Sequence, residues 1–138
     1  MTKTQKPLPQ PTPETQPFWD GCKRHELLLP LCLNCNRVHF YPRALCPHCW
    51  SADLKWVRSP GKGKLYSYVI NHRLAPGFED EVPFVIAIVE LEEGVRMMSN
   101  LVGVAADPDA LPIDLPLEVT FDDVNEAITL PKFRPASE

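Results

Sequence analysis

Hydrophobic and polar positions are spaced as in strands from about residue 54 to the end of the chain. Residues 84–91, FVIAIVEL, are almost all apolar and rich in β-branched side chains, as in a strand covered on both faces. Residues 117–121, LEVTF, alternate between apolar and polar, as in a half-buried strand. Upstream, DLKWVRSPGKGKLYSYVINHR predicts one long strand bent at Gly61 and Gly63, where the backbone can turn without a side-chain clash.

The remaining strand signals complete a small β domain. Glu92-Glu93-Gly94 predicts a tight turn into VRMMSNLVGV, and therefore a hairpin. The segment AITLPKF supplies a last short strand, which Pro131 must end or leave at an edge. A long bent strand, a hairpin, a linker and two short strands match the five-stranded Greek-key barrel called the OB-fold. A small sandwich fits five strands almost as well.

The amino-terminal part carries a different pattern. Residues 1–17 hold five prolines and almost no large apolar side chains, so we expect a disordered or extended tail. Residues 18–30 predict a short helix that ends at Pro30. Its apolar positions fall on roughly one helical face: Phe18, Trp19 and Cys22.

Residues 31–53 contain four of the five cysteines, arranged as two C-x2-C pairs with ten residues between them. Zinc prefers four tetrahedral thiolate or imidazole ligands, and each C-x2-C turn presents two sulfurs from one tight knuckle. The short spacer suits a hairpin, so the pattern predicts a rubredoxin-like zinc ribbon with one zinc per chain. The expected ligands are Cys32, Cys35, Cys46 and Cys49. Two disulfides are the alternative.

This predicted zinc site is structural, because four thiolates fill the coordination sphere and leave no position for water or substrate. His39 and His48 lie near the pairs, but four cysteines make them bystanders. Cys22 lies outside the pattern and is expected to be a packed, unreactive thiol.

The composition and the apolar segments of the sequence indicate in which compartment the protein resides. Its 138 residues are 44% hydrophobic and 23% charged, which is ordinary for one globular domain. No apolar run reaches the roughly 20 residues that span a bilayer, and the first residues lack the apolar core of a signal peptide. We therefore expect a cytoplasmic protein with no membrane partner, in which cysteines stay reduced and hold metal.

The net charge of −4 hides a division between the two parts of the chain. Residues 1–73 hold 11 Lys and Arg against 4 Asp and Glu, a balance of +7, while residues 74–138 hold 3 against 14, a balance of −11. This asymmetry is typical of a basic region that meets an anionic ligand or partner, and solvation of the two parts explains it equally well.

Several motifs in order resemble a known family. FWDG, the two knuckles, CPHC, the glycine-bent strand GKGKLYSY, PFVIAIVELEEG, SNLVG and ITLPKFRP together resemble the zinc-ribbon plus OB-fold proteins that accompany acyl-CoA enzymes, over residues 18–135. The resemblance implies a mainly β chain with four parts: a tail (1–17), a helix (18–30), a zinc ribbon (31–53) and an OB-fold barrel with a carboxyl-terminal tail (54–138). One departure leaves a turn undefined, since Asp114 stands where the family often has an isoleucine-glycine turn.

The resemblance also implies a function. Members of the family are small non-catalytic subunits of thiolase-superfamily enzymes, steroid side-chain aldolases and MaoC-type hydratases, and some are thought to hold or channel coenzyme A thioesters. Coenzyme A needs cations for its phosphates and an apolar slot for its pantetheine arm. The candidate cations lie on or beside the predicted barrel strands, although solvation at the surface is the favoured explanation for each: Lys62, Lys64, Arg73 and Arg96.

Docking to a partner enzyme needs apolar surface outside the main core. The candidates lie in the helix, the ribbon hairpin and the carboxyl-terminal segment: Phe18, Trp19, Phe40, Tyr41, Lys132, Phe133 and Arg134. Internal packing between ribbon and barrel is the alternative explanation for each aromatic residue. The segment 73–83, RLAPGFEDEVP, is long for a connection between strands and is a further candidate contact.

Three functions follow from these features. The first is an accessory subunit in a hetero-oligomer with an acyl-CoA enzyme, together with its acyl-CoA ligand. The second is a nucleic-acid-binding module, because OB-folds and zinc ribbons both serve that role. The acidic carboxyl-terminal part and the lack of a dense basic and aromatic strand face argue against it. The third, a stand-alone acyl-CoA enzyme, is disfavoured because no catalytic motif is recognisable in the sequence.

Overall fold

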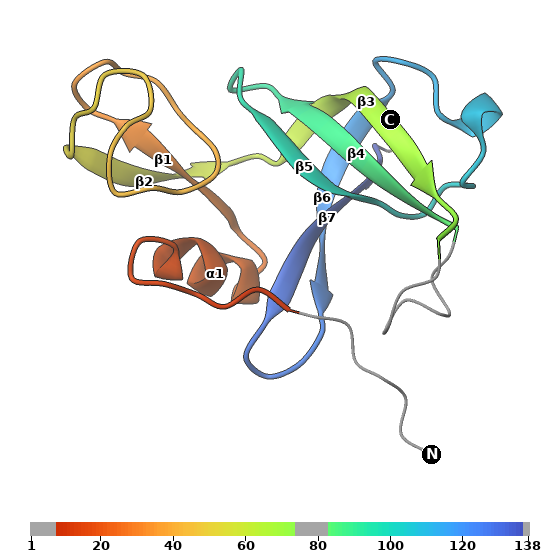
Figure 1. Cartoon of the computed structure of the whole chain (residues 1–138), viewed down its shortest axis with the longest axis horizontal. Helices are drawn as coiled ribbons and strands as arrows, with labels where there is room; N and C mark the ends of the chain where they lie inside the picture. The colour runs from red at the N-terminus through yellow and green to blue at the C-terminus, as the bar shows by residue number, and fades with distance from the viewer. Residues whose placement is uncertain (1–7, 74–82, 137–138) are drawn as a thin grey trace.

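The computed structural model describes residues 8–73 and 83–136, which form two lobes (Figure 1). One lobe consists of a helix and a two-stranded ribbon with the cysteine loops, and the other is a closed five-stranded barrel. The chain is therefore mainly β with one short α-helix, as predicted. No helix within the described ranges is long and apolar enough to cross a bilayer.

Helix α1 (Gln16–Lys23) is shorter than the helix predicted over 18–30. Its buried face is formed by Phe18, Trp19 and Cys22, as the sequence pattern predicts. The helix ends early because the chain reverses at His25, whose φ is 60°. Two residues of the predicted tail already belong to the helix, and Thr15 before them donates its backbone N–H to the Thr12 carbonyl at 3.0 Å. Residues 1–7 of that tail lie outside the described residues.

Strand β1 (Leu27–Cys32) begins inside the predicted helix, so the helical assignment of residues 27–30 was wrong. The strand pairs antiparallel with β2 (Leu54–Ser59), with Leu27 opposite Ser59 and Cys32 opposite Leu54. Burial along β1 follows the strand pairing and not a helical period, because Leu27 and Leu29 both face the core. Tertiary pairing therefore overrides the short apolar pattern that helix and strand share.

The predicted long bent strand is in fact two strands in different sheets. Strand β2 belongs to the ribbon, and β3 (Lys62–Asn71) begins the barrel. The bend lies where the glycines predicted it. Gly61 has a φ of 71°, and a Cβ on Gly63 would lie 2.4 Å from the Glu90 carbonyl oxygen of the neighbouring strand. Only glycine at position 63 lets β3 approach the strand that contains Glu90 so closely.

The barrel confirms the OB-fold prediction. Its other strands are β4 (Phe84–Leu91), β5 (Arg96–Leu101), β6 (Pro116–Asp123) and β7 (Thr129–Pro135). They close in the order β3-β4-β5-β7-β6, and a short 3-10 helix, η1 (Pro108–Ala110), lies in the connection from β5 to β6. Pairing is uneven around the barrel: β5 pairs with β4 at six positions but with β7 only where Leu101 meets Phe133.

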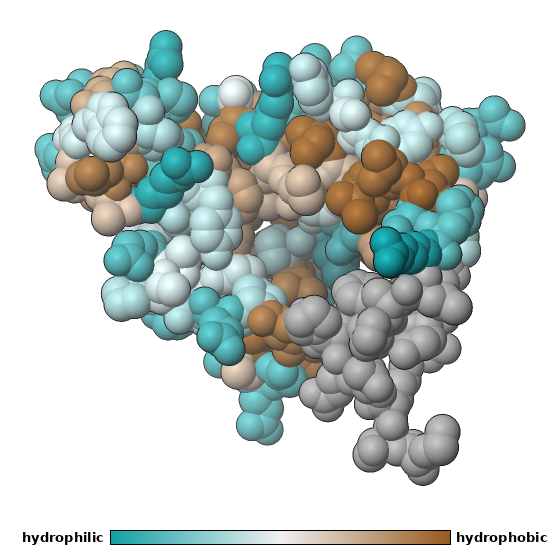
Figure 2. Space-filling view, viewed as in Figure 1, coloured by the Kyte–Doolittle hydropathy of each residue, from teal (hydrophilic) through white to brown (hydrophobic). Residues whose placement is uncertain are grey.

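Strand β4 is covered on one face and not on both, contrary to the prediction. The inward residues Val85, Ala87, Val89 and Leu91 are buried, whereas the alternate outward positions are only half-buried. The apolar run therefore contains a core face and an apolar outer face. Figure 2 shows apolar surface gathered on the barrel lobe.

The turn before β6 resolves the point that the sequence left open. Asp114 adopts a φ of 67°, a left-handed conformation that glycine favours and that Asp tolerates better than most residues. Its N–H donates to the Leu65 carbonyl at 2.9 Å, which ties the turn to β3. Asp114 therefore supplies the geometry expected of a glycine turn.

A single hydrophobic core joins the two lobes. It contains Phe18 and Trp19 of α1, Leu27 and Leu29 of β1, and the inward residues of the barrel with Phe133 at 0% exposure. The Phe18 and Trp19 rings meet edge-to-face with 4.9 Å between centroids. The ribbon is thus anchored to the barrel by apolar packing through α1 and β1.

Candidate metal centre and binding surfaces

The first cysteine knuckle follows directly after β1 in the chain. Cys32 ends the strand, and the Asn36 N–H donates to the Cys32 carbonyl at 2.8 Å to close the turn. The Cys35 N–H donates to the Cys32 sulfur at 3.4 Å, as expected for a loop that presents two thiolates to one metal. Asn36 adopts a φ of 61°, a conformation that Asn tolerates.

The second knuckle repeats this geometry. The Trp50 N–H donates to the Cys46 carbonyl at 2.8 Å, and the Cys46 N–H donates to the Ser51 carbonyl at 2.9 Å. The His48 N–H donates to the Cys46 sulfur at 3.3 Å. Trp50 occupies the position of Asn36 and has a φ of 68°.

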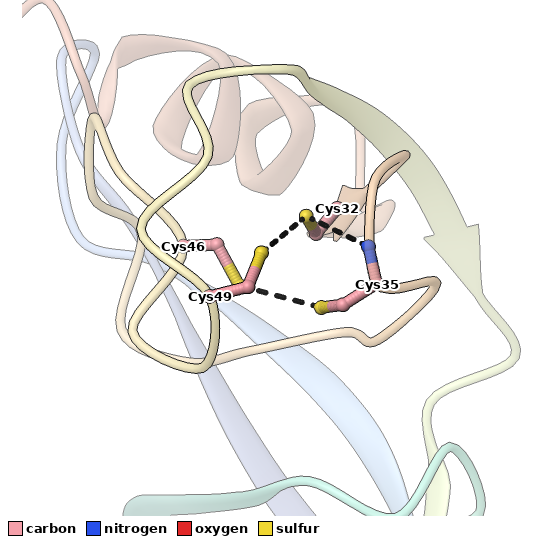
Figure 3. Close-up of side chains that lie close together, drawn as sticks. All are labelled: Cys32, Cys35, Cys46 and Cys49. Carbon is pink, nitrogen blue, oxygen red and sulfur yellow. Dashed lines mark hydrogen bonds between the residues drawn. The ribbon is translucent and has the colours of Figure 1, made fainter.

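The two knuckles bring four sulfurs together (Figure 3). All four lie within 4.8 Å of one another, with 3.5 Å between Cys32 and Cys49 and 3.7 Å between Cys35 and Cys46. A tetrahedron with Zn–S bonds of about 2.3 Å has sulfurs about 3.8 Å apart, so the donor set and spacing fit one zinc ion. Within the residues that the structure describes, this is the only cluster of potential metal ligands. The prediction of one structural zinc is therefore confirmed, and the structure brings together the four cysteines that the sequence indicated.

The thiols of this cluster differ in acidity. The Asn34 amide donates to the Cys49 sulfur at 3.4 Å and, with the Ser51 backbone, lowers the pKa of Cys49 to about 6. Desolvation and the neighbouring thiols raise the pKa of Cys35 to about 12. A bound zinc would hold all four sulfurs as thiolates and fold the ribbon around them.

The histidines near the ribbon lie outside the ligand cluster. His39 is buried, neither of its ring nitrogens has a hydrogen-bond partner within the described residues, and burial lowers its pKa, so the ring is neutral. His48 lies 3.5 Å from the Arg37 guanidinium. Cys22 is also separate: it is fully buried, and desolvation raises its pKa to about 12, as expected for an unreactive thiol.

The four cations considered for coenzyme A do not form one site. Lys62 and Lys64 line a pocket of about 460 Å³ at one end of the barrel, together with Leu91 and Leu117. Arg96 stacks over the Tyr66 ring at 3.8 Å. Arg73 follows the other end of the ten-residue strand β3, about 30 Å from Lys62 at the usual rise per residue.

Carboxylates already engage two of these cations. Glu90 lies 3.0 Å from Arg96 and 3.8 Å from Lys64, and Asp114 lies 3.6 Å from Lys64. Lys62 is exposed and forms no ion pair within the described chain. The structure therefore brings together Lys62, Lys64 and, through Glu90, Arg96.

Most of the residues considered for partner docking are internal. Phe18 and Phe133 are buried in the core, and Trp19 is only 7% exposed. Their assignment as exposed anchors is corrected, because α1 packs against β1 and β7. Lys132 is also buried and lies 2.9 Å from the Asp122 carboxylate, while Arg134 lies 3.5 Å from Glu118 on the barrel surface.

Two candidates line an apolar pocket between the lobes. Phe40 is half-buried and Tyr41 is 41% exposed. Together with Phe18, Trp19, Met97 and Lys132 they border a pocket of about 340 Å³. Residues 74–82 of the candidate loop lie outside the described residues.

Sequence reasoning missed two features of the surface. Trp50 is 76% exposed, which its place directly after the last zinc ligand could have indicated, since that position favours glycine or asparagine. His25 stacks on the Phe121 ring at 5.1 Å and places its Nε2 atom 3.0 Å from both Asp123 oxygens. These partners are 98 positions apart, so no local pattern could reveal them.

Comparison with known proteins matches both lobes. Residues 19–55 match the ChsH2 rubredoxin-like zinc ribbon domain, and residues 56–122 match the ChsH2 carboxyl-terminal OB-fold domain. A DUF35 domain-containing scaffold protein of Methanothermobacter thermautotrophicus is 38% identical over 105 residues, which cover 75% of this chain and 77% of the relative. The chain belongs to the ChsH2-type DUF35 family.

Other similar proteins are named as parts of enzymes. A probable enoyl-CoA hydratase alpha subunit of Thermomonospora curvata is 40% identical over 121 residues, and the matched region spans 86% of this chain but 37% of that subunit. A solved chain of the Ltp2-ChsH2(DUF35) aldolase superposes with a TM-score of 0.82 at 36% identity and covers 94% of this chain and 100% of the other. The family assignment predicted from the motifs is therefore confirmed.

Proposed function

We propose that this chain is a non-catalytic accessory subunit that binds a thiolase-superfamily acyl-CoA enzyme and helps to hold or channel its acyl-CoA thioester. The observation that carries the proposal is the closed four-cysteine cluster in a ChsH2-type scaffold. Four thiolates leave no open coordination position for hydrolytic chemistry, so the metal supports the fold.

A catalytic role for the isolated chain has little support. Cys22 is buried with a raised pKa, His39 is buried and neutral, and the His25–Asp123–Thr129 cluster has no nucleophile activated by His25. Proteins similar to the chain are named as a hydratase alpha subunit and as a component of an aldolase. A MaoC-type hydratase and a steroid side-chain aldolase are therefore the alternative partners.

The best-supported contact with coenzyme A is the pocket beside Lys62 and Lys64. Lys62 and Lys64 supply cations for the phosphates, although Lys64 also lies beside Glu90 and Asp114, while Leu91, Pro116 and Leu117 offer apolar surface to a pantetheine arm. Arg96 and Arg73 are weaker candidates, because neither lines this pocket: Arg96 stacks over Tyr66, and Arg73 follows the far end of β3.

The proposal includes a cytoplasmic location. Five cysteines without a disulfide suit a reducing compartment, in which a four-thiolate zinc site persists. No membrane partner is part of the proposal.

Purification of the tagged chain from its native host tests the function. We expect an acyl-CoA enzyme to co-purify at a fixed ratio, and the separated chain alone to turn over no acyl-CoA substrate. Restoring the chain should raise the activity or stability of the partner. Turnover that follows the chain alone, and disappears with one substitution in it, would contradict the proposal.

A charge substitution tests the contact with coenzyme A. In the complex, Lys62→Glu should raise KM for the acyl-CoA substrate with little change in kcat, because it removes ground-state binding of the phosphates. Lys23→Glu is the matched control, since Lys23 is also an exposed lysine but lies on α1. An unchanged KM in Lys62→Glu would remove this pocket from the proposal.

A further inference from the structure

Trp50 combines two costly properties on the ribbon. Its side chain is 76% exposed, and its φ of 68° is a left-handed conformation that bulky residues rarely adopt. The matching position of the first knuckle is filled by Asn36, which tolerates that conformation. The knuckle requires the left-handed conformation at this position, because the Trp50 N–H closes the turn on the Cys46 carbonyl, but it does not require a bulky exposed side chain there. Residues held in sparsely populated conformations are typical of functional sites.

Two other apolar side chains are exposed on the same pair of knuckles. Leu33 is 49% exposed beside Cys32, and Leu45 is 43% exposed beside Cys46. The hydrogen bond from Asn34 to the Cys49 sulfur joins the two knuckles around the metal site, and Figure 3 shows both loops enclosing the cysteines. We call Leu33, Leu45 and Trp50 the ribbon tip.

The charge around the ribbon tip is one-sided. Residues 33–55 contain three cations, Arg37, Arg43 and Lys55, against the single carboxylate of Asp53. All three cations are exposed, and none forms an ion pair with a carboxylate in the part of the chain that the structure describes. On the barrel, in contrast, four cations lie beside carboxylates: Lys64, Arg96, Lys132 and Arg134. The cysteine loops that carry the apolar ribbon tip are thus basic, with cations that are unpaired within the described residues.

We propose that Trp50 is the central anchor of a docking surface on the zinc ribbon, and that the occupant is a partner protein that presents an apolar pocket rimmed by Asp and Glu. Exposed Trp and Arg are the residue types that most often dominate protein interfaces. Free cations at the rim complement acidic groups and accelerate association. The inference rests on the proposed function in taking this partner to be the acyl-CoA enzyme.

A protein partner suits this surface better than nucleic acid. Single-stranded nucleic acid needs several stacking aromatics along a basic groove, whereas the ribbon tip offers one exposed indole. The chain as a whole carries a net charge of −4.

Two substitutions separate anchoring from folding. Trp50→Gly and Trp50→Asn both suit the left-handed conformation, so each should keep one zinc per chain and melt at or above the wild-type temperature. Each should nevertheless weaken binding to the acyl-CoA enzyme recovered with the wild-type chain and then purified, by about tenfold or more. Ile113→Ala is the matched control, because Ile113 is 63% exposed but lies on the barrel lobe. The affinity of this variant for the purified enzyme should stay at the wild-type value.

A spectroscopic measurement and a salt titration complete the test. In the chain labelled with 5-fluorotryptophan, the ¹⁹F resonance of Trp50 should lose its solvent isotope shift when the purified partner binds. Raising the salt concentration should weaken the wild-type complex, and Arg37→Glu with Arg43→Glu should reduce that dependence on salt.

The outcomes decide between the proposals. Wild-type affinity in both Trp50 variants, or a Trp50 resonance that stays solvent-exposed in the complex, overturns the anchor even though the complex forms and the proposed function stands. Retention of the chain on nucleic acid, or self-association at high concentration, also overturns it if either disappears in Trp50→Gly. If the co-purifying protein is not an acyl-CoA enzyme but is released by the Trp50 variants, the docking surface holds and the proposed function fails.

Discussion

The ribbon and the barrel of this chain reach a fixed structure by different means. In the barrel, every strand contributes at least one buried apolar side chain to the core, and Leu65, Ala87, Val89 and Phe133 are completely inaccessible. In the cysteine loops, residues 33–50, only His39, Pro42 and Cys46 are buried. So few buried side chains cannot offset the conformational entropy of ordering the loops, and metal ligation supplies the difference.

The two lobes are nevertheless not independent. Helix α1 and strand β1 place Phe18, Leu27 and Leu29 in the same core as the barrel residues. The cysteine loops should therefore depend on the metal alone, while α1 and β1 should follow the barrel. Substitutions in the loops, in the shared core and in the barrel wall test this division.

The largest effect is expected from Cys46→Ser. The substitution removes one of four thiolate ligands, and apparent zinc-binding free energies in such small modules are about 10–16 kcal/mol. Residues 33–53 should lose their fixed conformation while the barrel amides keep their native chemical shifts. Metal content measured by elemental analysis and a ¹H–¹⁵N correlation spectrum check this result. Cys22→Ser is the control, because Cys22 is not a ligand and its zinc content should stay at one per chain.

Phe133→Ala should be the next largest change, and it should affect both lobes. Phe133 is fully buried in the shared core, and truncation of a buried Phe typically costs about 3–5 kcal/mol of unfolding free energy. Urea unfolding measured by fluorescence and by circular dichroism gives the loss. Tyr41→Ala, at a half-exposed aromatic position, should cost far less. Equal losses in the two variants would show that the core is not shared as described.

Gly63→Ala should destabilise the barrel alone. A Cβ at this position would lie 2.4 Å from a backbone oxygen of β4, which cannot move without disturbing the strand pairing. We expect a loss of about 1–3 kcal/mol of unfolding free energy, with zinc content unchanged. Gly94→Ala is the comparison variant, because a Cβ on this turn glycine would meet open space and not a neighbouring strand. Its φ of 89° still makes alanine unfavourable at this position. If both variants unfold at the wild-type urea concentration, the close approach of β3 and β4 is wrong.

The smallest effect concerns the link between the lobes at Asp123. The Thr129 hydroxyl donates to this carboxylate at 2.7 Å and, together with His25, holds its pKa below the usual value. A depressed folded-state pKa stabilises the protein above the unfolded-state value of about 3.9, and the contribution disappears as the pH falls through the folded-state pKa. Asp123→Asn should therefore be less stable than wild type at pH 6, and the difference should shrink below about pH 4.

Denaturant titrations of both proteins across this pH range measure the difference. Loss of zinc at low pH affects both equally and cancels in the comparison. Glu126→Gln is the control, because its carboxylate makes no hydrogen bond or ion pair with the residues described. A difference that grows as the pH falls would reverse the sign expected for Asp123.

Structural features that depend on residues close together in the sequence could be predicted. The two C-x2-C pairs predicted the metal cluster because both ligands of each knuckle lie within four residues. The glycines at 61 and 63 predicted the bend because local sterics decide it. Residues 27–30 were misassigned because a short apolar run fits a helix or a strand, and only pairing with the distant strand β2 chooses between them.

The candidate site was predictable only where it was local. Phe18 and Phe133 looked like surface anchors because nothing near them in the sequence shows that α1 packs on the last strand. The sequence cannot show that Glu90 holds both Lys64 and Arg96, since that contact requires the register of three strands. Exposure of Trp50 likewise depends on what the rest of the chain leaves uncovered.

The uneven pairing of β5 has a consequence for amide hydrogen exchange. Because β5 meets β7 at one residue pair, its amides that point toward β7 have few ladder partners, while those that point toward β4 have a full set. Exchange along β5 should therefore alternate between slow and fast residues. The barrel is closed in outline but has one seam, and local opening of this seam should precede global unfolding.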